Sequence, residues 1–503
     1  MATTQPQRET SSDRAPSITK HDIEVIDPFQ DNTTNTDDGR STTSEISEAE
    51  RKLVRKLDYR IPPILCLLYF FAFLDRSNLG NARLQGLPED VLGGDPTGTL
   101  YAWIFSAFFF SYVLCQVPCV ILSKLFPPRR WLGISAIGFA LCSTLMATGF
   151  NFGSLFADRV MLGVFEAAFS PGIPLYLSYF YTKHEIGLRL AYYQTFSAVA
   201  GAFGGLIAFG VQNAHVSIAK WRLLFIIEGL PGMVMGVIAL FFLPDRPEMT
   251  GFFNEEERKL AMERRSRSIS ADIGYSLNKA HIWAALKDWR VYTGGIIFFG
   301  INCSLASVSA FLPTIIKSFG FTNAVAQLLT VPPYAVASIA LIGTCYMSDR
   351  IQNRGMLLAV ANAVCAIGYL ILLLVKTNIH ARYFATFCIT SGVITAVGLI
   401  ISWYPHNLGS ETKRATGIPL FMSIGQGGSI LGSQIFPSTE GPLYMYIVTC
   451  GLEFLAALCA IILSVSYLMD NRHRDRLYGK PKPDAEVDTS VLADKAPMFR
   501  YVP

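Results

Sequence analysis

Long apolar segments recur along this chain, with short polar connections between most of them. Each contains about 20 residues or more, the length that an α-helix needs to cross a hydrocarbon core roughly 30 Å thick. Because apolar and polar residues do not alternate within them, these segments indicate membrane helices and exclude a transmembrane β-barrel. We expect twelve helices, at residues 61–81, 98–122, 131–150, 155–180, 190–212, 222–243, 291–316, 324–347, 356–376, 381–404, 415–436 and 442–469.

A charged stretch between residues 244 and 290 divides these helices into two sets of six. The composition, 51% hydrophobic and 16% charged, agrees with a chain that has the bilayer as its main solvent. We therefore predict an all-α membrane protein of two pseudo-symmetric six-helix bundles. The expected regions are a disordered cytosolic tail at 1–50, bundles at 51–243 and 291–469, a cytosolic linker at 244–290 and a cytosolic tail at 470–503.

Lysine and arginine are unevenly distributed between the two sides of the predicted bundle. Cationic loops are retained in the cytosol, so the richer side predicts the orientation. That side includes both flanks and the linker, and we expect both termini to be cytosolic, in the plasma membrane. Its cations include Lys52, Arg55, Lys56, Arg60, Lys124, Arg129, Arg130, Lys183, Arg189, Arg350, Arg354, Lys413, Arg414, Arg472, Arg474 and Arg476.

The remaining composition excludes several functional classes. A net charge of +4 is too small to indicate a nucleic-acid partner, and all ten cysteines fall inside apolar segments, without a CxxC motif. We expect His281 and His380 in loops, with no spacing suited to a metal ion, and we predict no cofactor. No catalytic triad or phosphate-binding loop is recognisable, so we expect a membrane protein that is not an enzyme. We also expect it to be a monomer.

The two halves repeat a pattern at the cytosolic ends of the fourth and tenth predicted helices. In each half, aromatic residues at the end of the helix are followed by a glutamate and an arginine. These are Glu185 and Arg189 in one half and Glu411 and Arg414 in the other. We assign these four residues to gating. Glycine-rich helices follow both, and small residues permit close approach and sliding between helices, although static tight packing would need them too.

A second repeat compares residues 69–80 of the first half with 298–305 of the second. The charged Asp75 and Arg76 of the first half correspond to neutral polar residues in the second half. We infer that the first half would supply most of the countercharge for a charged solute.

Ionisable side chains at membrane depth are expensive and usually face a polar cavity. Arg76 and Arg159 are our candidates for binding a carboxylate, because a guanidinium stays charged and offers paired donors. Glu166 lies two turns from Arg159 on the same helix face, and we predict that it pairs with Arg159 and carries the coupled proton, assisted by Asp75. The alternatives are anchoring of helix ends and permanent structural ion pairs.

The chain resembles the major facilitator superfamily. The segment from Gly343 to Gly355 is similar to the superfamily's loop signature, which implies gating roles for Asp349, Arg350 and Arg354; the first-half copy, Ser123–Arg130, lacks the acid. Residues 74–81, 105–118, 159–172, 221–231 and 488–501 resemble the anion:cation symporters, and especially the fungal allantoate and nicotinate permease branch. In that branch arginines bind the anion at the positions of Arg76 and Arg159, and Asn78 belongs to the first of these motifs.

Further polar and aromatic side chains are candidates for the solute path, namely Asn302, Gln426 and Tyr112, although such residues also cross-link or pack helices. The resemblance implies proton-coupled symport of a small organic anion, most simply a vitamin or nitrogen-source carboxylate. Export of a fungal secondary metabolite is an alternative function, because the same residues could serve transport in either direction. A membrane nutrient sensor with the transporter fold is the alternative from another functional class.

Overall fold

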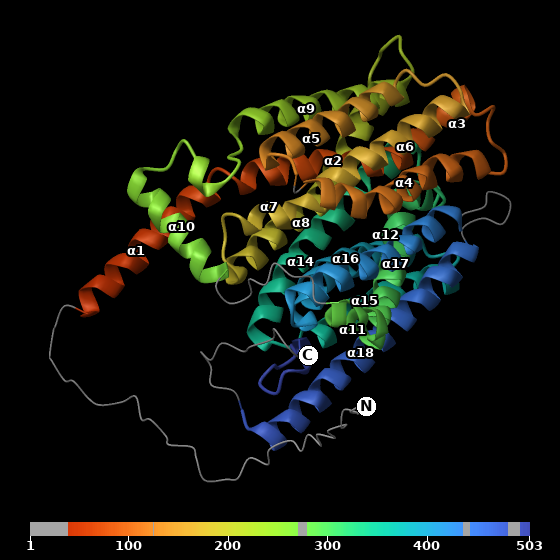
Figure 1. Cartoon of the computed structure of the whole chain (residues 1–503). Helices are drawn as coiled ribbons and strands as arrows, with labels where there is room; N and C mark the ends of the chain where they lie inside the picture. Colours follow the sequence, from red (N-terminus) through yellow and green to blue (C-terminus); the bar gives the residue numbers. More distant parts are fainter. Residues whose placement is uncertain (1–38, 124, 270–278, 436–442, 481–492) are drawn as a thin grey trace, which may run out of the picture. The chain divides into compact units, whose positions relative to one another are not determined.

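The structure is a computed structural model that describes residues 39–123, 125–269, 279–435, 443–480 and 493–503 (Figure 1). It separates into two units, Met1–Arg51 and Lys52–Pro503. In the first unit the described part is the beginning of helix α1 (Gly39–Asp58), so a helix starts within the segment that we predicted to be disordered. The rest of that prediction, residues 1–38, lies outside the described residues.

The first half of the larger unit is built from helices α2 to α9. The first predicted helix is followed by a short helical piece, α3. The fourth is divided into α6 and α7, because Ser170-Pro171-Gly172 breaks it. The bounds are α2 (Pro62–Leu84), α3 (Leu87–Val91), α4 (Thr99–Ser123), α5 (Pro128–Met146), α6 (Phe152–Phe169), α7 (Gly172–Ser178), α8 (Lys183–Asn213) and α9 (Lys220–Phe242).

The second half comprises helices α12 to α18. Its last helix continues nine residues beyond the end predicted at residue 469, since the polar residues after Tyr467 extend the helix. The bounds are α12 (Trp289–Lys317), α13 (Asn323–Leu328), α14 (Val331–Ile351), α15 (Arg354–Leu374), α16 (Ile379–Trp403), η2 (Tyr404–Leu408), α17 (Glu411–Gln434), α18 (Leu443–Tyr478) and η3 (Ala493–Lys495).

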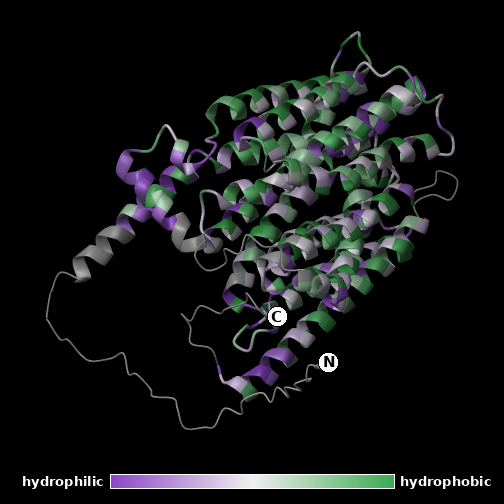
Figure 2. Ribbon diagram, in the orientation of Figure 1, coloured by the Kyte–Doolittle hydropathy of each residue, from purple (hydrophilic) through white to green (hydrophobic). Residues whose placement is uncertain are grey.

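Ten helical spans in the described part of the chain are long and apolar enough to cross a membrane. Helices α5 and α17 occupy the places of the third and eleventh predicted helices, so the arrangement is consistent with twelve. Hydrophobic residues cover the long helices, while hydrophilic ones gather on the linker and at helix ends (Figure 2). Many large apolar side chains are exposed on the outer surfaces, as expected for a protein that faces lipid.

The linker contains η1 (Pro247–Met249) and helices α10 (Glu255–Ile269) and α11 (Lys279–Lys287). Two of our expectations about histidine were wrong. His281 lies in α11, is buried, and hydrogen-bonds Ser410 at 3.0 Å. His380 lies in the first turn of α16, because Asn378 caps that helix by accepting from the Ala381 N–H.

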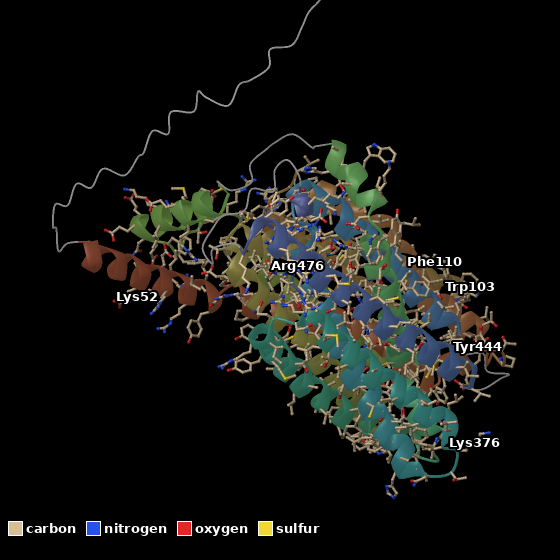
Figure 3. The ribbon with its side chains drawn as sticks, turned by 90° about the horizontal axis from the view of Figure 1, so that it is seen from below. Lys52, Trp103, Phe110, Lys376, Tyr444 and Arg476 are labelled. Atoms are coloured by element: carbon tan, nitrogen blue, oxygen red, sulfur yellow. The ribbon has the colours of Figure 1, made fainter. Side chains whose placement is uncertain are left out.

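The two halves meet through α2 with α12, α4 with α17, and α8 with α13 and α14. We call the end of the bundle near Lys52 and Arg476 the terminus face and the end near Trp103 and Lys376 the loop face (Figure 3). Hydrogen bonds between the halves gather toward the loop face. They include Asn323 to the Leu84 carbonyl (2.8 Å), Gln327 to the Asn81 carbonyl (3.3 Å) and Gln434 to Ser106 (2.7 Å).

Glycines permit the close contacts between these helices. A Cβ on Gly80 of α2 would lie 2.6 Å from the Ser309 carbonyl oxygen of α12, and one on Gly201 of α8 would lie 2.5 Å from the Tyr334 ring of α14. The glycine-rich α17 instead packs against α12 within the second half, where a Cβ on Gly428 would overlap the Phe299 carbonyl. The predicted close approach is therefore confirmed for α8 and α17, but of these two helices only α8 has glycines, Gly201 and Gly205, that lie between the halves.

Residues 493–503 fold back onto the second half. Trp403 and Asn407 both donate to the Val502 carbonyl, at 2.7 and 3.0 Å, and Asn407 accepts from the Val502 N–H at 2.8 Å. Asn471 makes a similar pair of hydrogen bonds with the backbone of Tyr501, whose ring stacks on Tyr467 of α18. This segment is thus part of the packed second half.

Candidate functional site

The centre of the candidate site is a buried ion pair between Arg76 of α2 and Glu166 of α6. The Glu166 side chain is 1% exposed, whereas that of Arg76 is 17% exposed. A charge removed from water to this degree needs a partner of opposite charge, and each of these side chains is that partner for the other.

Aromatic rings surround the guanidinium of Arg76. It lies over the rings of Phe108 and Tyr112 from α4, 5.0 and 5.3 Å from their centroids, and these two rings stack on each other. Cation–π contacts of this kind are stronger when the site is dry. The predicted site residues Arg76, Glu166 and Tyr112 therefore do come together.

The predicted pairing of Glu166 with Arg159 was wrong. Arg159 shares α6 with Glu166, but its guanidinium donates to the backbone carbonyl of Asp75 at 3.2 Å, and it is 1% exposed. The Asp75 carboxylate accepts from Ser143 of α5 at 2.5 Å. The sequence pattern alone favours two residues on one helix face, whereas in the folded bundle the arginine that pairs with Glu166 comes from the neighbouring helix α2.

The remaining candidates for the solute path lie apart from this cluster. Asn78 is fully buried on α2 beside Glu228 of α9, a carboxyl group that our reading of the sequence did not assign to the site. Asn302 lies on α12, and Gln426 on α17 accepts from Ser429 at 3.3 Å. No contact that the structure describes joins Asn302 or Gln426 to Arg76.

A small cavity lies between the halves, and one of its lining residues, Ser77, directly follows Arg76 in the chain. It is lined by Ser77, Asn81, Gly201, Gly205, Val308, Ser309, Leu312, Pro313, Thr330 and Tyr334. Both halves contribute to its wall, and its polar atoms come from hydroxyl and amide groups.

The residues predicted to gate the first half bind within that half and the linker. Arg189 of α8 makes two hydrogen bonds to the Asp58 carboxylate, at 2.9 and 2.5 Å, and Arg264 of α10 donates to Glu185 at 2.6 Å. Lys56 and Glu257 add another ion pair between α1 and α10, at 2.7 Å. These contacts tie the linker to the terminus face of the first half.

The second-half gating candidates are spread over two loops. Arg350 donates to the Tyr346 hydroxyl on its own helix at 2.6 Å, and Arg354 donates to the Ser402 carbonyl at 3.2 Å. Arg414 lies in the first turn of α17. Asp349 and Glu411 belong to α14 and α17, and their side chains fall outside the part of the structure that is described.

Lys413, which the sequence did not single out, is the buried cation of this region. It is 2% exposed and binds Asp288 at 2.6 Å and Asp494 at 2.8 Å, joining the linker, α17 and the C-terminal segment. Among the residues that the structure describes, no cluster of histidine, cysteine and acidic side chains could hold a metal ion.

The chain is similar to known membrane transporters over most of its length. The model of the Major Facilitator Superfamily matches residues 65–433. The major facilitator-type transporter hxnP of Emericella nidulans is 32% identical over 466 residues, covering 90% of this chain and 94% of its own. The high-affinity nicotinic acid transporter of Saccharomyces cerevisiae is 30% identical over 479 residues, covering 93% and 88%.

The fold is also found among solved structures. The crystal structure of a D-xylose–proton symporter aligns with a TM-score of 0.61 and 15% sequence identity, over 80% of this chain and 96% of its own. At this identity the likeness concerns the arrangement of helices.

Proposed function

Because the chain belongs to the major facilitator superfamily, and is thus a transporter and not an enzyme, we propose that it carries a small organic anion together with a proton by alternating access. The observation that supports this most is the buried Arg76–Glu166 pair with its aromatic surround. A guanidinium that is held by an internal carboxylate can exchange that carboxylate for one on the solute. The nicotinic acid transporter among the relatives makes a pyridine carboxylate the first candidate.

The proposed cycle uses competition for one cation. At its start Glu166 is ionised and pairs with Arg76, the contact that the two side chains make in the bundle. When Glu166 takes up a proton it loses its attraction for Arg76, and the guanidinium becomes available to the carboxylate of the solute. Return of the proton to water restores the internal pair and displaces the anion, so that binding of the two ligands is coupled. The stacked rings of Phe108 and Tyr112 would lie along a flat solute.

We further propose that the terminus face is cytosolic and that the protein works in the plasma membrane. The excess of lysine and arginine on that face supports this orientation. The inter-half hydrogen bonds near the loop face would then close the outer side. The linker contacts of Glu185 and Arg189 would rearrange with the first half, while Arg350, Arg354 and Arg414 would do so with the second.

Uptake of labelled carboxylates, nicotinate first, tests this proposal in cells that express Arg76→Lys. Lysine keeps the charge but loses the paired donors, and we expect uptake to fall about 10-fold or more, since a hydrogen bond to a charged group contributes about 1.5–3 kcal/mol. Arg83→Lys is the matched control. Arg83 lies two turns further along α2, over Tyr101 at 4.8 Å and Phe311 at 5.4 Å, and this variant should transport normally. Equal uptake by both variants for every anion tested would overturn the site assignment.

A second test separates the proton from the anion. Glu166→Gln should abolish accumulation driven by a pH gradient, while exchange of labelled for unlabelled anion continues. Loss of both activities would overturn the assignment of Glu166 as the group that carries the coupled proton.

A further inference from the structure

Each half buries one carboxyl group that the proposed cycle does not use. Glu228 of α9 is 1% exposed and Glu453 of α18 is 0% exposed. Neither oxygen of either carboxyl has a hydrogen-bond partner of ordinary geometry among the described residues. The ion pairs found in the described part of the chain include neither of them, in contrast to Glu166.

The two carboxyl groups occupy corresponding places in the repeat. Helices α9 and α18 are the last of their halves, and each packs against the first helix of its half, α2 or α12. Glu228 lies beside Asn78 of α2, and Glu453 lies beside Ser304 of α12. Asn78 and Ser304 are separated in sequence by the same interval as Arg76 and Asn302, and Glu228 and Glu453 by almost the same interval. The first helix of the second half has neutral residues where that of the first half has charges, but an acid on the last helix is present in both halves.

The groups that face these carboxyls are acidic or neutral. The groups that act on Glu228 are Asp75 and Asn78, both from α2. The groups near Glu453 are Cys303 and Ser304 from α12, Cys365 and Tyr369 from α15, and Cys450 from its own helix. No lysine, arginine or histidine among the residues with a described position acts on either carboxyl.

A carboxyl group in this setting must bind a cation or a proton. An ionised carboxylate without a partner is far more expensive to bury than a neutral acid, so it takes up a proton instead. A metal ion would need several oxygen ligands, and the surroundings of Glu453 offer one hydroxyl from Ser304 together with thiols and a phenol. The proton is the ligand that fits.

We propose that Glu228 and Glu453 are a repeat-related pair of proton-binding sites, one in each half, and that both hold protons in the conformation in which Glu166 is ionised by Arg76. No described contact joins either carboxyl to Arg76 or Glu166, and the proposal does not depend on the identity of the solute. The protein thereby binds protons on the last helix of each half in addition to the proton exchanged at Glu166.

Infrared difference spectroscopy of the purified protein in lipid nanodiscs tests this directly. Spectra of the wild type minus Glu453→Gln, and of the wild type minus Glu228→Gln, are recorded at neutral pH in H₂O and D₂O. We expect each difference to contain the C=O stretch of a protonated carboxylic acid, with a small D₂O shift, and no carboxylate stretch. A carboxylate stretch in either difference would overturn the proposal for that residue.

Glu257→Gln is the matched control for an ionised carboxyl. Burial alone would raise the pKa of Glu257, but the hydrogen bonds from Lys56 and from the Asn254 N–H lower this pKa below its ordinary value. Apart from the amide bands of the introduced glutamine, its difference spectrum should therefore contain carboxylate bands and no protonated-acid band.

Glu453→Asp and Glu228→Asp keep the test valid if a glutamine variant does not fold. Each keeps an acid at the site, and we expect the protonated-acid band to shift in frequency and not to disappear. The outcome is also independent of the proposed function. Normal uptake by Arg76→Lys would overturn the anion site and leave the bands in place, whereas carboxylate bands would overturn the proton pair and leave the Arg76 result unchanged.

Discussion

Replacing Arg76 by methionine should destabilise the protein in a pH-dependent way. The variant keeps an apolar side chain of similar length over the rings of Phe108 and Tyr112, but it leaves Glu166, 1% exposed, without its ion-pair partner. Arg159 acts on Glu166 only at longer range, since its guanidinium is bound to the Asp75 carbonyl. Glu166 must then be neutral in the folded variant.

The magnitude follows from the free energy of protonating a carboxyl. For a glutamate with a reference pKa of about 4.3, holding the group neutral at pH 7 costs about 3.7 kcal/mol, within the range of about 3–5 kcal/mol for broken buried pairs. The folded variant binds a proton that the unfolded chain has lost, so its stability rises as the pH falls. We expect a recovery of about 2.7 kcal/mol between pH 7 and pH 5, with little further gain below the reference pKa.

Glu166→Gln should be less harmful than Arg76→Met. The guanidinium that remains is 17% exposed and still lies on two aromatic rings, which contribute about 0.5–2 kcal/mol to holding a cation. In the double variant Arg76→Met/Glu166→Gln no charge is left unpaired, and the combined loss should be well below the sum of the single losses.

Thermal and denaturant unfolding of the wild type, the two single variants and the double variant in detergent, at several pH values, gives the pH dependence of the stability loss and the coupling between the two side chains. A loss in Arg76→Met that does not change with pH would refute the view that Glu166 is held ionised by Arg76. Additive losses in the double variant would refute the direct coupling between the two side chains.

Two further predictions concern the second half. Lys413→Met removes the cation shared by Asp288 and Asp494, which are 14% and 5% exposed, and should lower the free energy of unfolding by about 3–5 kcal/mol. Asp494→Asn leaves Lys413 paired with Asp288 and should lower this free energy clearly less. Equal losses in the two variants would contradict a shared ion pair. Gly428→Ala forces α17 away from the Phe299 carbonyl and should lower stability by about 1–3 kcal/mol, whereas Gly451→Ala on α18, where a Cβ meets open space, should be neutral or stabilise by up to about 1 kcal/mol.

The helices could be predicted from the sequence because the bilayer imposes one length and one polarity on each span. Every predicted span corresponds to one helix or to two consecutive helices, and most ends agree within a few residues. The two histidines were misplaced because a short amphipathic linker helix and a capped first turn have no strong apolar signal. The folded contacts of residues 493–503 could not be predicted either, since they depend on single hydrogen bonds to Trp403 and Asn407.

The site was predictable in its residue types but not in its pairings. Cost of burial alone marks Arg76, Arg159 and Glu166 as unusual, and the structure does bring Arg76 and Glu166 together. Which guanidinium meets Glu166 depends on the rotation and height of α2 against α6, and a helical pattern within one helix carries no information about either. Glu228 and Glu453 were missed for a related reason, because a lone acid in an apolar run gives no hint of its surroundings.

The comparison of the two halves explains why charge is retained at some places of the repeat and lost at others. If the first helices of both halves carried an arginine, two buried cations would compete for one anion, and the unoccupied cation would remain without a partner. Asn302 at the place of Arg76 avoids this, so the first half alone supplies the countercharge. A neutral acid has no such requirement, since its proton is its partner, and both halves can keep one on the last helix without affecting the other. The asymmetry in arginine and the symmetry in glutamate thus have the same electrostatic origin.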